Sequence, residues 1–359
     1  MKMKKCMNVL KITFSCVFFL FAFIACEEND PKPEPIVPTS GIFILNQGYF
    51  GANNSGISYY DFKTGATTFD ITDGKLGDTG QDMIIYGSKL YVSVYGSSVI
   101  NVIDLKTATS LKNIAVKNGN QGRGPRYLTS YNGKVYASTY DDGNVIRIDT
   151  TTLTIEAVIK VGSNPEGIAA ANGKLYVANS NGLNFPNFDN TLSVVDIATF
   201  TETKKITVGL NPNYVAADDY GNIYLSYRGN HDDIPSGMQK IDTKTDVATN
   251  LTGVSCGASF TIVDDILYYF DVTYNADNST NSTFGRYNIK TGQKVPGEVI
   301  TDNTKINTAS AIGVDPESKD VYISDTNYST PDKVYIFGAD GVRKKTIEVG
   351  ISACKFVFK

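Results

Sequence analysis

The sequence predicts an all-β fold, a seven-bladed β-propeller, on three observations. A short apolar strand with an aromatic residue at its third position recurs seven times, with aromatic anchors at Phe43, Tyr91, Tyr136, Tyr176, Tyr224, Tyr268 and Tyr322. Successive anchors are 40 to 54 residues apart, and a strand-rich period of about 40–50 residues is typical of propeller blades. The chain also ends in a strand-like segment, residues 354–359, beyond the last complete repeat.

Residues 1–25 have the pattern of a secretory signal peptide. Lys2, Lys4 and Lys5 precede an apolar stretch that ends in small Ala25. A single membrane-spanning anchor is the alternative, but the stretch is short for a bilayer and Lys11 interrupts it. The segment Phe-Ile-Ala-Cys at 23–26 resembles a bacterial lipobox, which implies that Cys26 is lipidated and becomes the first mature residue.

Residues 26–40 are expected to form a stiff, solvated tether. Three prolines and four acidic residues fall within 27–35, and such a composition cannot pack into a core. The acidic cluster after Cys26 resembles the surface-export signal of Bacteroidetes lipoproteins. That resemblance implies a lipid-anchored position on the outer membrane, at the cell surface. A periplasmic-facing orientation, or a plain soluble linker, is the alternative.

Residues 41–359 are expected to form the propeller, with about 46 residues per repeat. In the fourth repeat, 165–170 predicts inner strand A, 174–179 strand B, 191–196 strand C and 201–209 outer strand D. Alternating β-branched and aromatic residues bounded by Asn-Gly or Lys-Thr-Gly turns indicate these strands. The first repeat begins at strand B, so residues 354–359 are predicted to supply its missing strand A. Closing the ring in this way removes the exposed sheet edges.

Charge and residue counts exclude several function classes. Without the four lysines of the signal peptide, 29 basic residues remain against 37 acidic ones, a net charge of −8. A basic surface for nucleic acid is therefore not expected. His231 is the only histidine, which excludes multi-histidine metal sites. We expect no metal site and no cofactor, and we expect that the protein is not an enzyme. Cys256 and Cys354 are the only mature cysteines besides Cys26, and whether they pair stays open.

The B–C and D–A connections share one face of a propeller, and here they are long and rich in aromatic residues and amides. Several B–C loops, such as 47–56, 180–190 and 272–285, exceed what a hairpin needs. Long loops on a rigid scaffold commonly carry binding sites. The candidate ligand-binding residues are Tyr49, Phe50, Asn54, Tyr95, Arg123, Arg126, Tyr140, Phe185, Asn187, Phe188, Tyr227, Arg228, His231, Tyr274, Asn327 and Tyr328. Each of them also has a structural reading, as interblade packing or as a turn residue.

The repeat Pro-x-Gly-Ile, Gly-Lys-Leu-Tyr-Val-Ala-Asn, Val-Val-Asp and Val-Gly resembles YncE-like propellers across residues 41–359. The opening at 41–48 and 58–61 is similar to a family of Bacteroidetes surface lipoproteins that includes BtuG-type proteins. This resemblance implies capture of vitamin B12 or a related corrinoid and its delivery to a TonB-dependent outer-membrane transporter. The corrinoid would be cargo, held without covalent chemistry.

Two other functions are compatible with the sequence. The same face of the propeller could bind a protein or a glycan of unknown identity. A lyase or lactonase type of propeller enzyme is the third possibility, although no nucleophile motif surrounds a serine.

Overall fold

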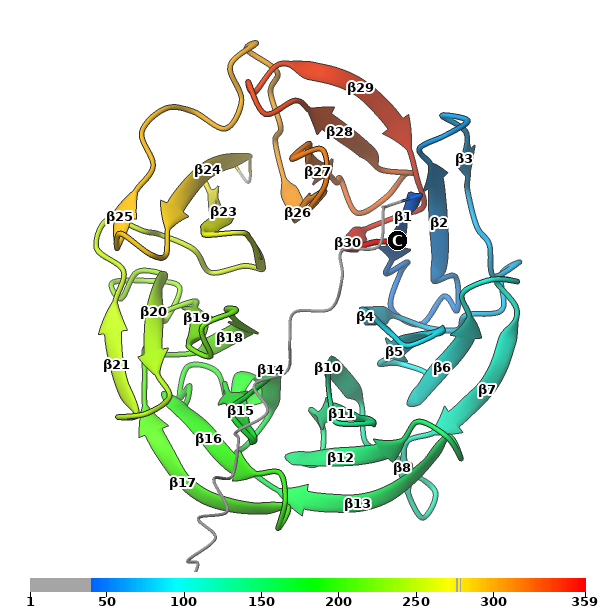
Figure 1. Ribbon diagram of the computed structural model, residues 1–359, viewed down its shortest axis with the longest axis vertical. Coiled ribbons are helices and arrows are strands. Elements are labelled where there is room, and N and C mark those ends of the chain that lie inside the picture. The colour runs from blue at the N-terminus through cyan, green and yellow to red at the C-terminus, as the bar shows by residue number, and fades with distance from the viewer. Residues whose placement is uncertain (1–39, 276, 278) are drawn as a thin grey trace, which may run out of the picture. The chain divides into compact units, whose positions relative to one another are not determined.

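The computed structural model describes residues 40–275, 277 and 279–359. The predicted signal peptide, Cys26 and all of the predicted tether except Ser40 lie outside these residues. Seven four-stranded antiparallel sheets are arranged around a central axis as the blades of a propeller (Figure 1), which confirms the predicted fold class. Within the described part of the chain there is no α-helix, only one 3-10 turn, η1 (Gly182–Asn184).

The first four blades have the following strands. Blade 1 contains β1 (Gly41–Asn46), β2 (Gly56–Asp61), β3 (Thr67–Thr68) and β30 (Ala353–Phe358), and blade 2 contains β4 (Gly80–Tyr86), β5 (Lys89–Val94), β6 (Val99–Asp104) and β7 (Ser110–Ala115). Blade 3 contains β10 (Pro125–Tyr131), β11 (Lys134–Thr139), β12 (Asn144–Asp149) and β13 (Thr154–Lys160), and blade 4 contains β14 (Pro165–Ala171), β15 (Lys174–Asn179), β16 (Thr191–Asp196) and β17 (Thr201–Thr207).

The remaining three blades complete the ring. Blade 5 contains β18 (Pro212–Ala217), β19 (Ile223–Tyr227), β20 (Gly237–Asp242) and β21 (Val247–Asn250), and blade 6 contains β22 (Phe260–Val263), β23 (Ile266–Tyr274), β24 (Thr280–Asn288) and β25 (Gln293–Lys294). Blade 7 contains β26 (Ala309–Val314), β27 (Val321–Asp325), β28 (Lys333–Phe337) and β29 (Arg343–Glu348). A small hairpin between blades 2 and 3, β8 (Lys117–Asn118) with β9 (Gln121–Gly122), was not predicted.

The ring closes as predicted, because β30 pairs with β1 in antiparallel register. Ile42, Phe43 and Ile44 lie opposite Phe358, Val357 and Phe356. Lys359 donates its backbone N–H to the Gly41 carbonyl at 2.9 Å. The last strand of the chain thus becomes the innermost strand of the first blade (Figure 1).

The core lies in the layers between blades, where the aromatic anchors pack. Tyr91, Tyr136, Tyr176 and Tyr224 are all buried. Tyr176 of blade 4, for example, belongs to a cluster that includes Val215 and Leu225 of blade 5. Burial raises the pKa of Tyr91 and Tyr176 to about 12, so these phenols are neutral at physiological pH. The repeating aromatic in the sequence is therefore an interblade packing residue.

Serine at the fifth position of strand B links neighbouring blades by hydrogen bonds. A bulge in β10 frees the Tyr127 N–H from the ladder, and this N–H donates to Ser138 Oγ at 3.1 Å. Ser138 Oγ in turn donates to the Glu166 carbonyl of the next blade at 2.6 Å. Ser226 makes the same pair of bonds, from Tyr214 N and to the Ala258 carbonyl.

We predict that Ser138→Ala destabilises the protein by about 2 kcal/mol, because it leaves two buried backbone groups without partners. The measurement is the urea midpoint of unfolding. Ser88→Ala is the matched control, since Ser88 lies exposed in a turn of blade 2, and it should leave the midpoint unchanged. Equal midpoints for the two variants would contradict the interblade role of Ser138.

The acidic residue that ends most C strands organises the turn that follows it. Asp196 accepts from the Thr199 N–H at 2.8 Å and from the Thr199 hydroxyl at 2.8 Å. These bonds hold the pKa of Asp196 below its usual value. In blade 6 the equivalent residue is Asn288, which accepts from the Thr291 N–H at 2.9 Å.

Asp196→Asn is expected to keep the turn and to change only the pH dependence of stability. Because the folded-state pKa of Asp196 is lowered, its contribution is present above the unfolded value near 3.8 and is lost as pH falls through the folded value. The variant should therefore have a lower Tm than the parent at pH 6, and the two Tm values should converge near pH 2. A constant difference across this range would show that the charge of Asp196 has no part in stability.

One predicted loop is wrong. Residues 272–285 were expected to form a long B–C loop, but strands β23 and β24 extend through most of this range, and Tyr274 pairs with Thr280. The reason is that β-branched and aromatic residues such as Val272, Thr273 and Phe284 continue the pleated pairing despite the polar residues among them. Tyr274 therefore lies at the end of strand β23, paired across the hairpin with Thr280.

The possible disulfide is also settled, since Cys256 and Cys354 are both free thiols. Cys256 is fully buried beside blade 6, and burial raises its pKa to about 12. Burial also raises the pKa of Cys354 to about 12. Both thiols are therefore protonated at physiological pH and packed as small apolar groups.

Candidate functional site

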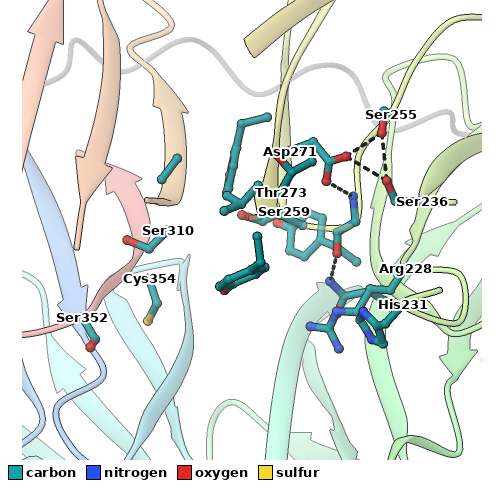
Figure 2. A pocket seen from close by; sticks show the side chains of 18 of the residues that line it. Arg228, His231, Ser236, Ser255, Ser259, Asp271, Thr273, Ser310, Ser352 and Cys354 are labelled. Carbon is teal, nitrogen blue, oxygen red and sulfur yellow. Dashed lines mark hydrogen bonds between the residues drawn. The ribbon is translucent and has the colours of Figure 1, made fainter. Parts of the chain in front are cut away.

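A cavity of about 630 Å³ lies on the side of the propeller where the B–C and D–A connections meet, beside blades 5 and 6. Its size is within the range usual for small-molecule pockets. Figure 2 shows Arg228, His231, Ser236, Ser255 and Asp271 grouped along one wall, with Ser310, Ser352 and Cys354 across from them. Inner strands and loops from several blades thus contribute to one hollow.

Buried ion pairs lie in and beside the cavity wall. The Glu166 carboxylate, which is 1% exposed, accepts from Arg126 Nε at 3.0 Å and from Arg126 Nη2 at 2.9 Å. Arg126 Nη1 donates to Gln81 Oε1 at 3.0 Å. Burial by itself would lower the pKa of Arg126, but the carboxylate outweighs burial and the pKa is raised. Arg126 is therefore held as a cation by a two-bond partner.

A second ion pair joins β30 to β4. Lys355 Nζ lies 3.0 Å from Asp82 Oδ1 and donates to the Tyr214 hydroxyl at 2.9 Å. Burial opposes the charge on Lys355, but Asp82 and Tyr214 together raise its pKa. The other Asp82 oxygen accepts from the Leu128 N–H at 2.8 Å. The ring-closing strand is thus also fixed electrostatically, at the wall of the cavity.

Asp271 holds the blade-6 side of the cavity together (Figure 2). Its Oδ2 accepts from Ser236 Oγ at 2.8 Å and from Ser255 Oγ at 2.5 Å, and its Oδ1 accepts from the Gly257 N–H at 3.1 Å. Among the described residues, the ring nitrogens of His231 approach only the Asn211 amide, at 3.4 Å. Burial and the nearby Arg228 lower the pKa of His231, so the imidazole is neutral. The cluster positions loops and presents polar groups to the cavity.

Exposed apolar side chains concentrate around this face. Of the thirteen large apolar side chains exposed in the described part of the chain, eight lie on its connections or at the β23–β24 tip: Tyr49, Phe50, Phe69, Leu183, Phe185, Ile234, Tyr274 and Tyr328. Only Tyr220 and Val342 lie on turns of the opposite face. An exposed apolar patch around a hollow is characteristic of a binding surface.

Four of the candidate residues line the cavity: Arg228, His231, Tyr274 and Tyr328. Two more extend it outward, because the Phe188 ring packs 5.8 Å from the His231 ring and 5.7 Å from the Phe185 ring. Tyr49 and Phe50 are exposed on the blade-1 loop, whose first residue, Gln47, reaches the cavity.

The other candidate residues are engaged in the scaffold. Tyr95 and Tyr140 both stack on the Arg126 guanidinium, with Tyr140 at 4.5 Å, and Arg123 pairs with Asp142. Three amide and aromatic candidates stabilise neighbouring backbone: Asn54 accepts from the Tyr49 N–H, Asn327 caps the Ser329 and Thr330 amides, and Tyr227 packs over Gly209 and Gly237. Asn187 is exposed, and its carbonyl accepts from Asn181.

The strands contribute cavity residues that loop position alone did not indicate. The inner strands provide Gln81, Asp82, Tyr127, Asn213, Tyr214, Ser310 and Lys355, and strand β23 provides Asp271. A signal for several of them exists in the repeats. In β4, β10, β14, β18 and β26, a polar residue stands directly after the first residue, where the strand pattern would allow an apolar one: Gln81, Arg126, Glu166, Asn213 and Ser310. Aligning the repeats on this position would have identified the wall of the central channel.

Within residues 40–275, 277 and 279–359, no three His, Cys, Asp or Glu side chains form a group suited to a metal ion. No helix in this part of the chain is long and apolar enough to cross a membrane.

Fold and cavity together define a seven-bladed propeller with a ligand-sized hollow on its loop-bearing face. The chain belongs to the family described as a domain of unknown function (DUF5074), whose model matches residues 40–351. No curated protein shows significant similarity to it.

Solved structures share the fold at low identity. A putative 6-phosphogluconolactonase from Bacteroides uniformis has a TM-score of 0.65 and 10% identity, covering 89% of this chain and 100% of that one. A functionally unknown protein from Desulfotomaculum acetoxidans has a TM-score of 0.61 and 16% identity, and the match covers 89% of this chain and 99% of that one. Kuenenia stuttgartiensis hydrazine synthase has a TM-score of 0.58 and 17% identity, and the match covers 71% of this chain and 74% of that one. These identities establish the fold alone.

Proposed function

We propose that the protein is a lipid-anchored surface lipoprotein that binds a corrinoid on the loop-bearing face of the propeller and passes it to a TonB-dependent outer-membrane transporter. Binding involves no covalent chemistry. The resemblance of residues 41–61 to BtuG-type lipoproteins supports the ligand class, and the cavity beside blades 5 and 6 supports the proposed location.

The observation that carries this proposal is the combination of a cavity lined by both polar and apolar groups with a rim of exposed aromatic residues. A corrinoid has a flat ring with apolar surface and a rim of amide side chains. Tyr274 and Tyr328 offer stacking surface at the mouth of the cavity, and Asn213, Ser259 and Ser310 offer polar partners within it. Because a corrinoid is larger than the cavity, one part of it would enter while the rim aromatics cover the remainder.

Delivery to a transporter would use the apolar surface that the ligand leaves uncovered. Phe50 is 78% exposed and Leu183 is 70% exposed, and neither lines the cavity. Such side chains gain by burial against another protein surface. The transporter would thus meet the same face that presents the ligand.

The direct test is to incubate the mature chain with cyanocobalamin and to follow gel filtration by visible absorbance. Co-elution of the red ligand with the protein supports the proposal. Absence of co-elution at micromolar concentrations would favour a protein- or glycan-binding role for the same face. Ligand turnover instead of retention would indicate an enzyme.

Anchoring has its own prediction, which concerns a residue outside the described part of the chain. Cys26→Ala should release the protein from membranes or stall its processing, because a lipidated cysteine would hold an otherwise soluble chain. The measurement is partitioning between membrane and soluble fractions after export. Unchanged partitioning of a correctly exported variant would refute lipidation at Cys26.

A further inference from the structure

Arg228 is a cavity cation that lacks a closely bonded anion. Its nearest carboxylate is Glu166, with Arg228 Nη1 at 3.6 Å from Oε1, beyond hydrogen-bond distance. Both oxygens of Glu166 already accept short bonds from Arg126. One carboxylate therefore faces two guanidinium groups, and Arg228 is the one that makes no hydrogen bond to it.

The other two cations near the cavity are fully engaged, which distinguishes Arg228 from them. Arg126 has a two-bond carboxylate partner, an amide partner and two aromatic rings on its faces. Lys355 has Asp82 and Tyr214. Within the described residues, the Arg228 side chain makes no hydrogen bond, and about a third of it (35%) remains exposed. Its five N–H donors are therefore available to a ligand.

Neighbouring residues fix both the backbone and the side-chain stem of Arg228. Its backbone N–H donates to the Asn211 carbonyl at 3.0 Å, directly after strand β19. Gly257 lies against the side-chain stem, since a Cβ added to Gly257 would come within 3.5 Å of Arg228 Cγ. The stem thus packs against the connection between blades 5 and 6 while the guanidinium borders the cavity (Figure 2).

The three carboxylates that line the cavity make no ion pair with Arg228, and one of them, Asp82, is paired with Lys355. Asp271 lines the same wall, but its two oxygens accept three hydrogen bonds from Ser236, Ser255 and Gly257. Asp232 is exposed in the 228–236 loop, and neither carboxylate lies within ion-pair distance of Arg228. His231 adds no competing charge, because its imidazole is neutral.

From these unused donors at the cavity we infer that Arg228 is the anion-binding residue of the cavity and takes a phosphate or carboxylate group of the ligand. Guanidinium groups bind both with paired, charge-assisted hydrogen bonds. The inference rests on the proposed function in one respect: in cobalamin the matching group is the phosphodiester of the nucleotide loop. Cobinamide lacks that loop and its phosphodiester, so the two corrinoids separate the anion from the ring.

The first experiment compares the affinities of cyanocobalamin and dicyanocobinamide for the wild-type chain, Arg228→Gln and Lys117→Gln. Arg228→Gln should weaken cyanocobalamin binding roughly ten- to hundredfold and leave cobinamide binding unchanged. The substitution is expected to fold, because Glu166 keeps both bonds to Arg126. Lys117→Gln, which removes an exposed charge from a connection on the same face, should change neither affinity. Equal loss for both corrinoids, or no loss for either, would overturn the inference.

The second experiment measures the rise in Tm with sodium phosphate, and separately with sodium acetate, against sodium chloride of equal ionic strength. A larger rise in the wild-type chain than in Arg228→Gln supports an anion site, and the preferred anion tells phosphate from carboxylate. If no corrinoid binds, the proposed function falls and this measurement decides the inference alone. Identical rises in the two proteins would then overturn it.

Discussion

Removing residues 353–359 is expected to abolish cooperative unfolding of the whole propeller. The deletion takes away the inner strand of blade 1, its pairing with β1 and the buried side chains of Ala353 and Phe356. It also leaves Asp82 without Lys355 in a buried position. Losing one buried aromatic side chain commonly costs about 3–5 kcal/mol, and whole domains are stable by only about 5–15 kcal/mol. Thermal and urea unfolding followed by circular dichroism would measure the effect.

The matched control keeps β30 and adds an equally long Gly-Ser tail after Lys359. That protein should unfold with the Tm of the parent, because the chain end changes while the strand does not. A truncated protein that melts within about two degrees of the parent would show that β30 is dispensable, and the ring-closure account would be wrong.

The largest effect on binding is expected for the aromatic residues at and around the cavity. Alanine at Tyr274 should weaken corrinoid binding about thirtyfold or more, since truncating a central aromatic residue of a binding surface commonly costs about 2 kcal/mol or more. Alanine at Arg228, Phe185 or Phe188 should cause the next-largest losses of affinity. Alanine at Tyr49 or Phe50 should cause smaller losses, because these residues lie on the blade-1 loop. Titration of each variant with cyanocobalamin measures these losses.

The Tm of each of these variants should stay near that of the parent. Tyr274 is 70% exposed and Phe185 is 69% exposed, so removing either ring leaves the interblade core intact. Tyr220→Ala is the matched control, because it removes an aromatic ring that is also exposed but lies on the opposite face. If Tyr220→Ala weakened cyanocobalamin binding and Tyr274→Ala did not, the ligand would bind on the opposite face and our account would be wrong.

The fold could be predicted because its determinants are local and repeat. The aromatic third residue of strand B, the Asp that ends strand C and the turn residues each recur at a fixed place. The terminal segment had only one vacant strand position to fill. The extension of the β23–β24 hairpin was missed because pairing between strands that contain polar residues depends on cross-strand neighbours, and these are not visible in either strand alone.

The site could be predicted only in part, for a similar reason. Loop position indicated Arg228, His231, Tyr274 and Tyr328, which the fold brings to one cavity. The same reasoning also selected Tyr95, Tyr140 and Arg126, which satisfy one another across blades 2 and 3. Whether a loop side chain is free or paired depends on partners that can be 40 or 45 residues away, and only the closed ring sets those contacts. Arg126 and Arg228 show the contrast, since they share Glu166 but only one of them is bonded to it.

Cobalt provides the most direct measurement of the central claim, that the cavity beside blades 5 and 6 receives the corrinoid. Crystals of the mature chain grown with cyanocobalamin would be measured at the cobalt absorption edge, where anomalous scattering locates the metal without reference to the protein. Our account predicts one cobalt site over the cavity, close to Arg228, Tyr274 and Tyr328. A site on the A–B and C–D face, or crystals of ligand-free protein at saturating cyanocobalamin, would contradict it.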